Sequence, residues 1–158
     1  MTLKELRKQR GLTQKQAAET IRMSLRSYIS YEHDESKIGT PKYVFLVKLL
    51  DQFTQIDEEH GILSIDQITE TCREVFEDYD IKYCYLFGSY CKGSATEKSD
   101  VDLLISTPLT GLKFFGLAEA LREKLNKKVD LLNTKQLANN ELLLEEILDQ
   151  GIKIYGKN

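Results

Sequence analysis

The chain has little proline and no long run of apolar residues. With two prolines among 158 residues and a hydrophobic content of 41%, we expect a modest packed core and no long disordered tract. No apolar run approaches the length of a membrane span, and the N-terminus begins with a polar amphipathic pattern instead of a signal peptide. We therefore expect a cytoplasmic protein that does not bind a membrane.

Cysteine is also scarce. Cys72, Cys84 and Cys91 are odd in number and form no Cys-X-X-Cys pair, so neither a disulfide framework nor a zinc site is expected. We assign none of the three a chemical role.

Charge is distributed unevenly along the chain. Residues 1–50 contain ten Lys or Arg and five Asp or Glu, whereas residues 51–158 contain twelve and twenty. The first segment is a plausible polyanion binder, and the acidic second segment would not bind nucleic acid strongly by itself. Length and charge together favour two small domains.

The first fifty residues carry the pattern of four short helices. The first ends at Gly11, the second begins at Thr13 with Gln16 completing a capping box, the third begins at Ser24 and the fourth opens at Pro41. The side chains of the fourth helix expected to pack inward are Val44, Phe45, Val47, Leu49 and Leu50.

Two helices joined by a short turn are what DNA reading in the major groove requires. The expected DNA contacts are Gln14, Arg26 and Ser30, with Arg26 offering a fork to guanine or phosphate and Gln14 a donor to the backbone. The alternative for Arg26 is a solvated surface charge. Tyr28 and Tyr31 follow the apolar face and are expected in the core.

Over about Leu3 to Phe53, the segments Leu12-Thr13-Gln14 and Tyr31-Glu32 resemble the XRE-type helix-turn-helix regulators. The resemblance implies binding to operator DNA, and paired half-sites would imply a homodimer. Two features depart from the family pattern: Arg22 stands in the turn where relatives usually have glycine, and Ile29 falls on the outer face of the recognition helix.

The most informative stretch lies further along the chain. Gly88-Ser89 is followed after ten residues by Asp100-Val101-Asp102, and strand-like segments flank the loop between them. Because side chains alternate along a strand, Asp100 and Asp102 should point the same way, about 7 Å apart. Two carboxylates so placed favour a hard divalent cation, Mg²⁺ or Mn²⁺.

The loop itself suits a nucleotide. Gly88 allows close approach of the backbone, and Ser89 with the following amides would open a short helix that attracts phosphate oxygens. Lys92 could neutralise a triphosphate, or could simply be solvated.

A third carboxylate would complete the site. Residues 127–132 form another short strand pattern, and if this strand pairs beside the Asp100 segment, Asp130 can face the same metal ions and act as general base. The alternative is a charged residue at a strand edge.

From Gly88 to Ile105 the sequence resembles the signature of the DNA polymerase β-type nucleotidyltransferases, and its shortness resembles the minimal nucleotidyltransferases of the MNT antitoxin type. The resemblance extends over about Ser64 to Tyr155. It implies an α+β domain with a mixed sheet flanked by helices, ATP as substrate and metal-assisted transfer of AMP. Many relatives have arginines in the loop where Tyr90 and Lys92 stand here.

The resemblance also implies a partner: a toxin of the HEPN ribonuclease class, neutralised by adenylylation of a tyrosine, with the chain repressing the operon that encodes both. The expected domains are a helix-turn-helix at 1–54, a linker at 55–63 and the transferase at 64–158. Two alternatives remain open. The chain could be a catalytically silent antitoxin that occludes its toxin, or a small-molecule transferase of the aminoglycoside type with a helical dimerisation module.

Overall fold

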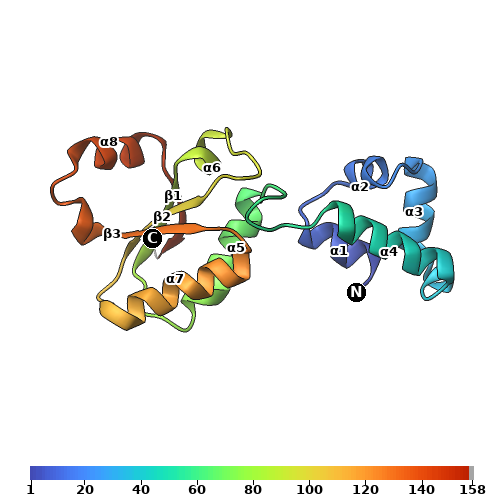
Figure 1. The fold of residues 1–158 in the computed structure, drawn as a ribbon, viewed down its shortest axis with the longest axis horizontal. Coiled ribbons are helices and arrows are strands. Elements are labelled where there is room, and N and C mark those ends of the chain that lie inside the picture. Colours follow the sequence, from blue (N-terminus) through green and yellow to red (C-terminus); the bar gives the residue numbers. More distant parts are fainter. Residues whose placement is uncertain (157–158) are drawn as a thin grey trace. The chain divides into compact units, whose positions relative to one another are not determined.

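The computed structural model describes residues 1–156, and the chain divides into two compact units, residues 1–56 and residues 57 onward. Figure 1 shows the helices and strands of both units, and each unit has its own core. Within the part of the chain that the structure describes, we find no helix with the length and apolarity needed to cross a membrane.

The first unit is entirely helical. Its elements are α1 (Leu3–Gln9), α2 (Gln14–Thr20), α3 (Leu25–His33), a 3₁₀ turn η1 (Glu35–Lys37) and α4 (Pro41–Phe53). The predicted helix starts are confirmed: Thr13 and Gln16 form a reciprocal capping box, the Ser24 side chain accepts a hydrogen bond from the backbone of Ser27, and Pro41 is in the first turn of α4.

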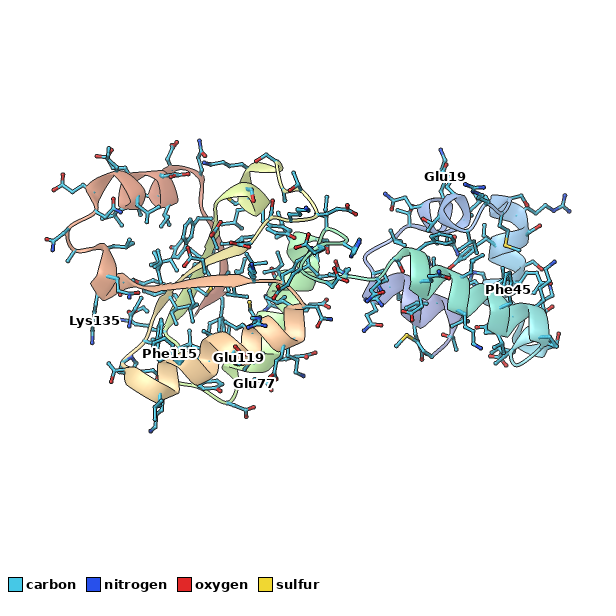
Figure 2. All side chains as sticks on the ribbon, in the orientation of Figure 1. Glu19, Phe45, Glu77, Phe115, Glu119 and Lys135 are labelled. Carbon is cyan, nitrogen blue, oxygen red and sulfur yellow. The ribbon has the colours of Figure 1, made fainter. Side chains whose placement is uncertain are left out.

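The predicted inner face of α4 is wrong in part. Val44 and Phe45 are exposed, and Figure 2 shows Phe45 on the outside of the unit. The core instead takes Tyr43 from the first turn of α4, whose hydroxyl accepts a hydrogen bond from the Leu3 amide at 3.0 Å. The buried residues of this unit are Leu3, Leu6, Ala17, Ala18, Ile21, Tyr28, Tyr43, Leu46 and Leu50.

The turn between α2 and α3 forms without glycine. Arg22 takes the left-handed conformation, with φ of 54°, and the next amide, that of Met23, donates to the Ala18 carbonyl at 2.8 Å. A side chain in this region costs about 1–2 kcal/mol relative to glycine. The helix-turn-helix geometry therefore survives the substitution.

The second unit is a four-stranded sheet with helices on both faces. Its elements are α5 (Ile65–Phe76), β1 (Tyr83–Phe87), α6 (Ser89–Lys92), β2 (Val101–Ser106), α7 (Gly111–Leu125), β3 (Val129–Asn133), a 3₁₀ turn η2 (Thr134–Leu137), α8 (Glu141–Gln150) and β4 (Ile152–Gly156). The strand order is β3-β2-β1-β4, with β2 and β3 parallel and the other pairs antiparallel. The expected α+β class with a mixed sheet is confirmed.

The two faces of the sheet bury different sets of side chains. On one face Phe87 and Leu104 pack against Ile147 of α8. Alternation along β2 turns Leu103 and Ile105 to the other face, which α5 and α7 cover (Figure 1). Both faces of β2 are thus buried, which explains its nearly continuous apolar sequence.

A buried lysine holds the loops around the start of β3. The side chain of Lys127 is fully buried, and its amino group donates to the carbonyl oxygens of His60, at 3.1 Å, and Glu97, at 2.5 Å. Burial lowers the pKa of this ammonium group. The hydrogen bond from Lys127 to His60 therefore holds the segment after residue 56 against the rest of the second unit. The strand predicted to begin at Lys127 begins at Val129 in the structure.

Candidate active site

Two carboxylates meet on neighbouring strands. Asp102 of β2 and Asp130 of β3 are register partners in the parallel pair, and strands in a sheet lie about 4.8 Å apart. By alternation, both side chains lie on the sheet face that α8 covers. Asp100 is exposed and precedes β2 by one residue. The expected pairing of the Asp130 strand beside the Asp102 strand is therefore observed.

The electrostatics of Asp102 reflect this crowding. Burial, followed by the charges of Asp130, Asp100 and Glu146, raises the pKa of the Asp102 carboxyl to about 6. Each of these carboxylates disfavours ionisation of Asp102 unless a cation offsets the charge. The site is built to attract positive charge.

Gly88 allows the loop to approach these carboxylates. Its φ of 72° and ψ of −152° lie in a region that essentially only glycine occupies. A Cβ atom at this position would stand 2.0 Å from Oδ2 of Asp102, far inside van der Waals contact. The backbone of Gly88 thus passes close to Asp102, whose side chain fills the space beside it. The close approach of a ligand to Gly88 stays a prediction.

The loop continues into the short helix predicted at Ser89. Helix α6 ends at Lys92, its C-cap Gly93 takes the left-handed conformation, and the amide of Ser94 donates to the Ser89 carbonyl at 3.0 Å. Lys92, the last residue of α6, forms an ion pair with Glu146 of α8. The hydrogen bond from Lys92 to Glu146 raises the pKa of the Lys92 ammonium group.

Asp100 and Asp130 also share a cavity. It has a volume of about 390 Å³, and its lining is completed by Glu58, Arg122, Lys128 and Val129. The Arg122 Nε atom donates to Oε1 of Glu58 at 3.2 Å. A larger cavity of about 1160 Å³ lies at the other end of the sheet, beside Tyr83 and Gly156. The smaller cavity is lined by two of the three predicted acids but not by Asp102, so the candidate active site is the group of carboxylates beside Gly88, with this cavity at its edge.

The donors suit a hard metal ion, although they are not gathered into a finished cluster. Within residues 1–156, no three acidic, histidine or cysteine side chains are close enough together to hold a metal as they stand. The donor set is nevertheless all carboxylate oxygen, which Mg²⁺ prefers. The Asp102 carboxylate lies where a Cβ atom of residue 88 would stand, and the negative charges of Asp130, Asp100 and Glu146 act on it. The residues present therefore fit a divalent cation at Asp102 and Asp130.

Sequence reasoning missed two neighbours of this site. Glu146 contributes to the raised pKa of Asp102 and pairs with Lys92, and Lys128 lines the cavity with Asp130. Glu146 is 54 residues from Lys92, and no local pattern marks such a contact. Lys128 stood beside Asp130 in the sequence and could have been singled out as a cation near the acids.

The three residues expected to touch DNA lie in the first unit and differ in their hydrogen-bond partners. Arg26 is exposed on α3 and makes no hydrogen bond or ion pair with any residue that the structure describes. The Gln14 side chain donates to Oε1 of Glu32 at 3.2 Å, and the Ser30 hydroxyl accepts a hydrogen bond from Lys37. Of the three side chains, that of Arg26 is thus the one without a partner in the described part of the chain.

Comparison with known proteins finds two family models, one for the later and one for the earlier part of the chain. Residues 70–158 match the family model described as polymerase beta, nucleotidyltransferase, and residues 2–62 match a helix-turn-helix domain. A putative protein adenylyltransferase of Methanocaldococcus jannaschii, MJ0126, is 38% identical over 84 residues, which are 52% of this chain and 85% of that protein. The protein adenylyltransferase MntA of Thermococcus cleftensis is 33% identical over 96 residues, 56% of this chain and 97% of that protein.

Among solved structures, a crystal structure of a toxin-antitoxin with AMP-PNP is similar in fold. It is 24% identical, with a TM-score of 0.50, and the match covers 57% of this chain and 74% of that one. Paired carboxylates beside a glycine-hinged loop, a mixed sheet and these relatives lead to one assignment. The chain belongs to the polymerase β-type nucleotidyltransferase family, as a minimal member related to the MntA protein adenylyltransferases and joined to an XRE-type helix-turn-helix domain.

Proposed function

We propose that this chain is an antitoxin that transfers AMP from ATP to a partner toxin of the HEPN class and represses its own operon. The observation that carries the enzymatic part is the pairing of Asp102 with Asp130 beside Gly88. The kind of acceptor is supported by the relatives, which are named protein adenylyltransferases.

Asp102 and Asp130, with Asp100 beside them, would hold the divalent cation, Mg²⁺ or Mn²⁺. Bound there, the metal would offset the charge of the triphosphate and make the α-phosphorus more electrophilic. The chain's own groups would bind the rest of the nucleotide. Gly88 gives the phosphates access to the backbone, and the Ser89 hydroxyl with the adjacent amides would hold the β- and γ-phosphates. Lys92 would add a positive charge.

Asp130 would act as general base. Its side chain is exposed, so a hydroxyl carried by another protein can reach it. Asp130 takes the proton of the acceptor tyrosine while the phenolic oxygen forms a bond to the α-phosphorus. The bond from that phosphorus to the bridging oxygen breaks, and pyrophosphate leaves. AMP remains on the acceptor.

Repression would be the work of the first unit. Its excess of basic residues suits a polyanion. Arg26 is exposed on the helix that would enter the major groove and has no hydrogen-bond or ion-pair partner among residues 1–156. Paired half-sites would require two copies of the chain.

The test is to incubate the purified protein with α-labelled ATP, Mg²⁺ and the purified product of the adjacent gene. Label on the partner that disappears with Asp100→Ala, but persists with the exposed control Asp78→Ala, supports the proposal. Inhibition of the partner without label would show an occluding antitoxin that has no transferase activity. Label found only on aminoglycosides or similar compounds would show a small-molecule enzyme.

A further inference from the structure

Helix α8 has two different faces. Its inner face, with Leu143 and Ile147, packs on the side of the sheet that carries Asp102. Leu142, Leu144 and Leu148 of the same helix are 82%, 39% and 73% exposed. At about 100° per residue, Leu142 and Leu148 lie on either side of Glu145 and Asp149 on the outward face, and Leu144 lies at the edge of that face. Three leucines in water on a ten-residue helix are more than the scattered apolar side chains of an ordinary surface.

The same helix is strongly acidic. It carries Glu141, Glu145, Glu146 and Asp149 and has no lysine or arginine. An acid in the first turn stabilises a helix, but Asp149 in the last turn faces the negative end of the helix dipole. Helix stability therefore does not account for this charge. A binding partner with basic side chains would.

The position of α8 links this surface to the chemistry. Glu146 forms an ion pair with Lys92 on the loop predicted to bind phosphates, and its charge acts on Asp102. A protein seated on the outer leucines would lie beside the paired carboxylates.

We propose that Leu142, Leu144 and Leu148 of α8, with Glu145 and Asp149 beside them, form the docking surface for the protein that supplies the acceptor hydroxyl. The occupant is a segment with apolar side chains flanked by lysine or arginine, because it must cover the leucines and meet the acids. This inference rests on the proposed function and adds to it the location and the chemistry of the contact.

Helix α7 offers a matched control. Leu112 and Phe115 are 89% and 70% exposed, as apolar and as open as the leucines of α8. The inner residues of α7, Leu117 and Leu121, are fully buried on the opposite face of the sheet. Figure 2 shows Phe115 on α7, away from α8. Exposed apolar area alone would make the two surfaces equivalent. Asp102, however, lies on the sheet face that α8 covers, and the α7 residue that lines the cavity with Asp100 and Asp130 is Arg122, near the opposite end of α7 from Leu112 and Phe115.

The experiment compares full-length Leu142→Ser/Leu148→Ser with full-length Leu112→Ser/Phe115→Ser. The probe is the purified product of the adjacent gene, with affinity measured by calorimetry in the absence of ATP. We expect the Kd of the α8 variant to rise about tenfold or more, since each buried leucine contributes substantially to binding. The α7 variant should bind as the wild type does. Because all four side chains are exposed, both variants should unfold at the wild-type temperature.

Charge gives a second measurement. Glu145→Lys/Asp149→Lys should also weaken binding, with the loss growing as the salt concentration falls. Equal affinity of the wild type and the α8 variants, or no binding of the probe by the wild type, would overturn the docking proposal. The two proposals fail differently. Binding that depends on α8 without any transfer of label refutes the transferase alone, and transfer that ignores the α8 variants refutes the docking surface alone.

Discussion

Lys92 on α6 and Glu146 on α8 form an ion pair that joins the nucleotide loop to the helix beside the carboxylates. Both side chains are partly exposed, so the pair can open in solvent. The Lys92 ammonium group would interact less strongly with a triphosphate while it is paired with Glu146. We therefore predict two states of the loop: the paired state seen here, and a second state in which the pair is open and Lys92 is available to phosphate.

Removing the negative partner should favour the second state. In Glu146→Gln we expect Mg·ATP to bind more tightly, by up to about fivefold, because an exposed ion pair contributes little and only that little is regained. Lys92→Met should weaken binding. The double variant should resemble Lys92→Met, since Glu146 would then have no cation to hold. Calorimetric titration with Mg·ATP measures all three.

The matched control is Glu145→Gln, which removes an equal charge from the neighbouring position of α8, where no ion pair is recorded with the residues described. Its Kd for Mg·ATP should stay near the wild-type value. If Glu145→Gln and Glu146→Gln changed the affinity equally, the effect would come from general charge, and a specific role for the Lys92 pair would be refuted.

A methyl group at residue 88 should damage the site more than one at residue 93. In Gly88→Ala the backbone conformation costs about 1–3 kcal/mol, and the new Cβ would displace the Asp102 carboxylate. In Gly93→Ala the new Cβ would have no atom within 4 Å, so the expected cost is only that of a left-handed φ at a residue other than glycine. We expect loss of AMP transfer in the first variant, and a transfer rate near that of the wild type in the second. Label transfer and thermal unfolding are the two measurements.

An unchanged rate in Gly88→Ala would contradict the close approach of the loop to Asp102. A large loss in both glycine variants would point to loop flexibility as the requirement, in place of the contact with the carboxylate.

Local signals in the sequence predicted the local structure well. Thr13, Gln16 and Ser24 cap helices as expected because capping uses bonds between residues two or three apart. The strands that carry Asp102 and Asp130 were each predicted from their short apolar patterns, whereas their pairing, which the structure shows, was only a condition for Asp130 to face the same metal ions. Gly88 had a recognisable role because only glycine accepts its backbone angles.

Predictions that depended on distant neighbours were less successful. Helix α4 has apolar side chains on several sides, and periodicity alone did not show that Phe45 faces outward while Tyr43 enters the core. Asp100 was placed in the strand with Asp102, yet β2 begins one residue later. Glu146 gave no signal, because its contact with Lys92 exists only once α8 has packed on the sheet.

A buried ion pair should make the stability of the first unit depend on pH. Arg7 donates through Nε and Nη2 to both carboxylate oxygens of Glu32, each at 2.8 Å, and the Glu32 side chain is 1% exposed. Burial alone would raise the pKa of the Glu32 carboxyl, but the hydrogen bonds from Arg7 and Gln14 outweigh it and hold the pKa below its usual value. The pair therefore stabilises the unit above the unfolded-state pKa, and this stabilisation is lost as pH falls through the folded-state pKa.

Glu32→Gln should lower the free energy of unfolding at pH 7 by about 1–3 kcal/mol. The difference from the wild type should shrink as the pH falls below about 4. Urea unfolding followed through amide signals of residues 3–50 measures it. Asp51→Asn is the control, because Asp51 pairs with Arg10 but is 60% exposed, and we expect it to cost under about 1 kcal/mol. A difference for Glu32→Gln that stayed constant with pH would refute the charge-based explanation.

Operator binding should depend on Arg26 and not on basic residues of the second unit. Arg26 is exposed on α3, whereas Lys153 lies on β4 of the sheet. In a fluorescence titration with promoter DNA, Arg26→Ala should raise the Kd by about tenfold, as expected for loss of a bidentate contact to a base or phosphate. Lys153→Ala should change it little. If Arg26 reads a base, the loss should be confined to the operator, and if it touches phosphate, unrelated DNA should lose affinity to a similar degree and the salt dependence should flatten. Equal losses for Arg26→Ala and Lys153→Ala would show that α3 is not the recognition surface, and repression by this unit would then require another explanation.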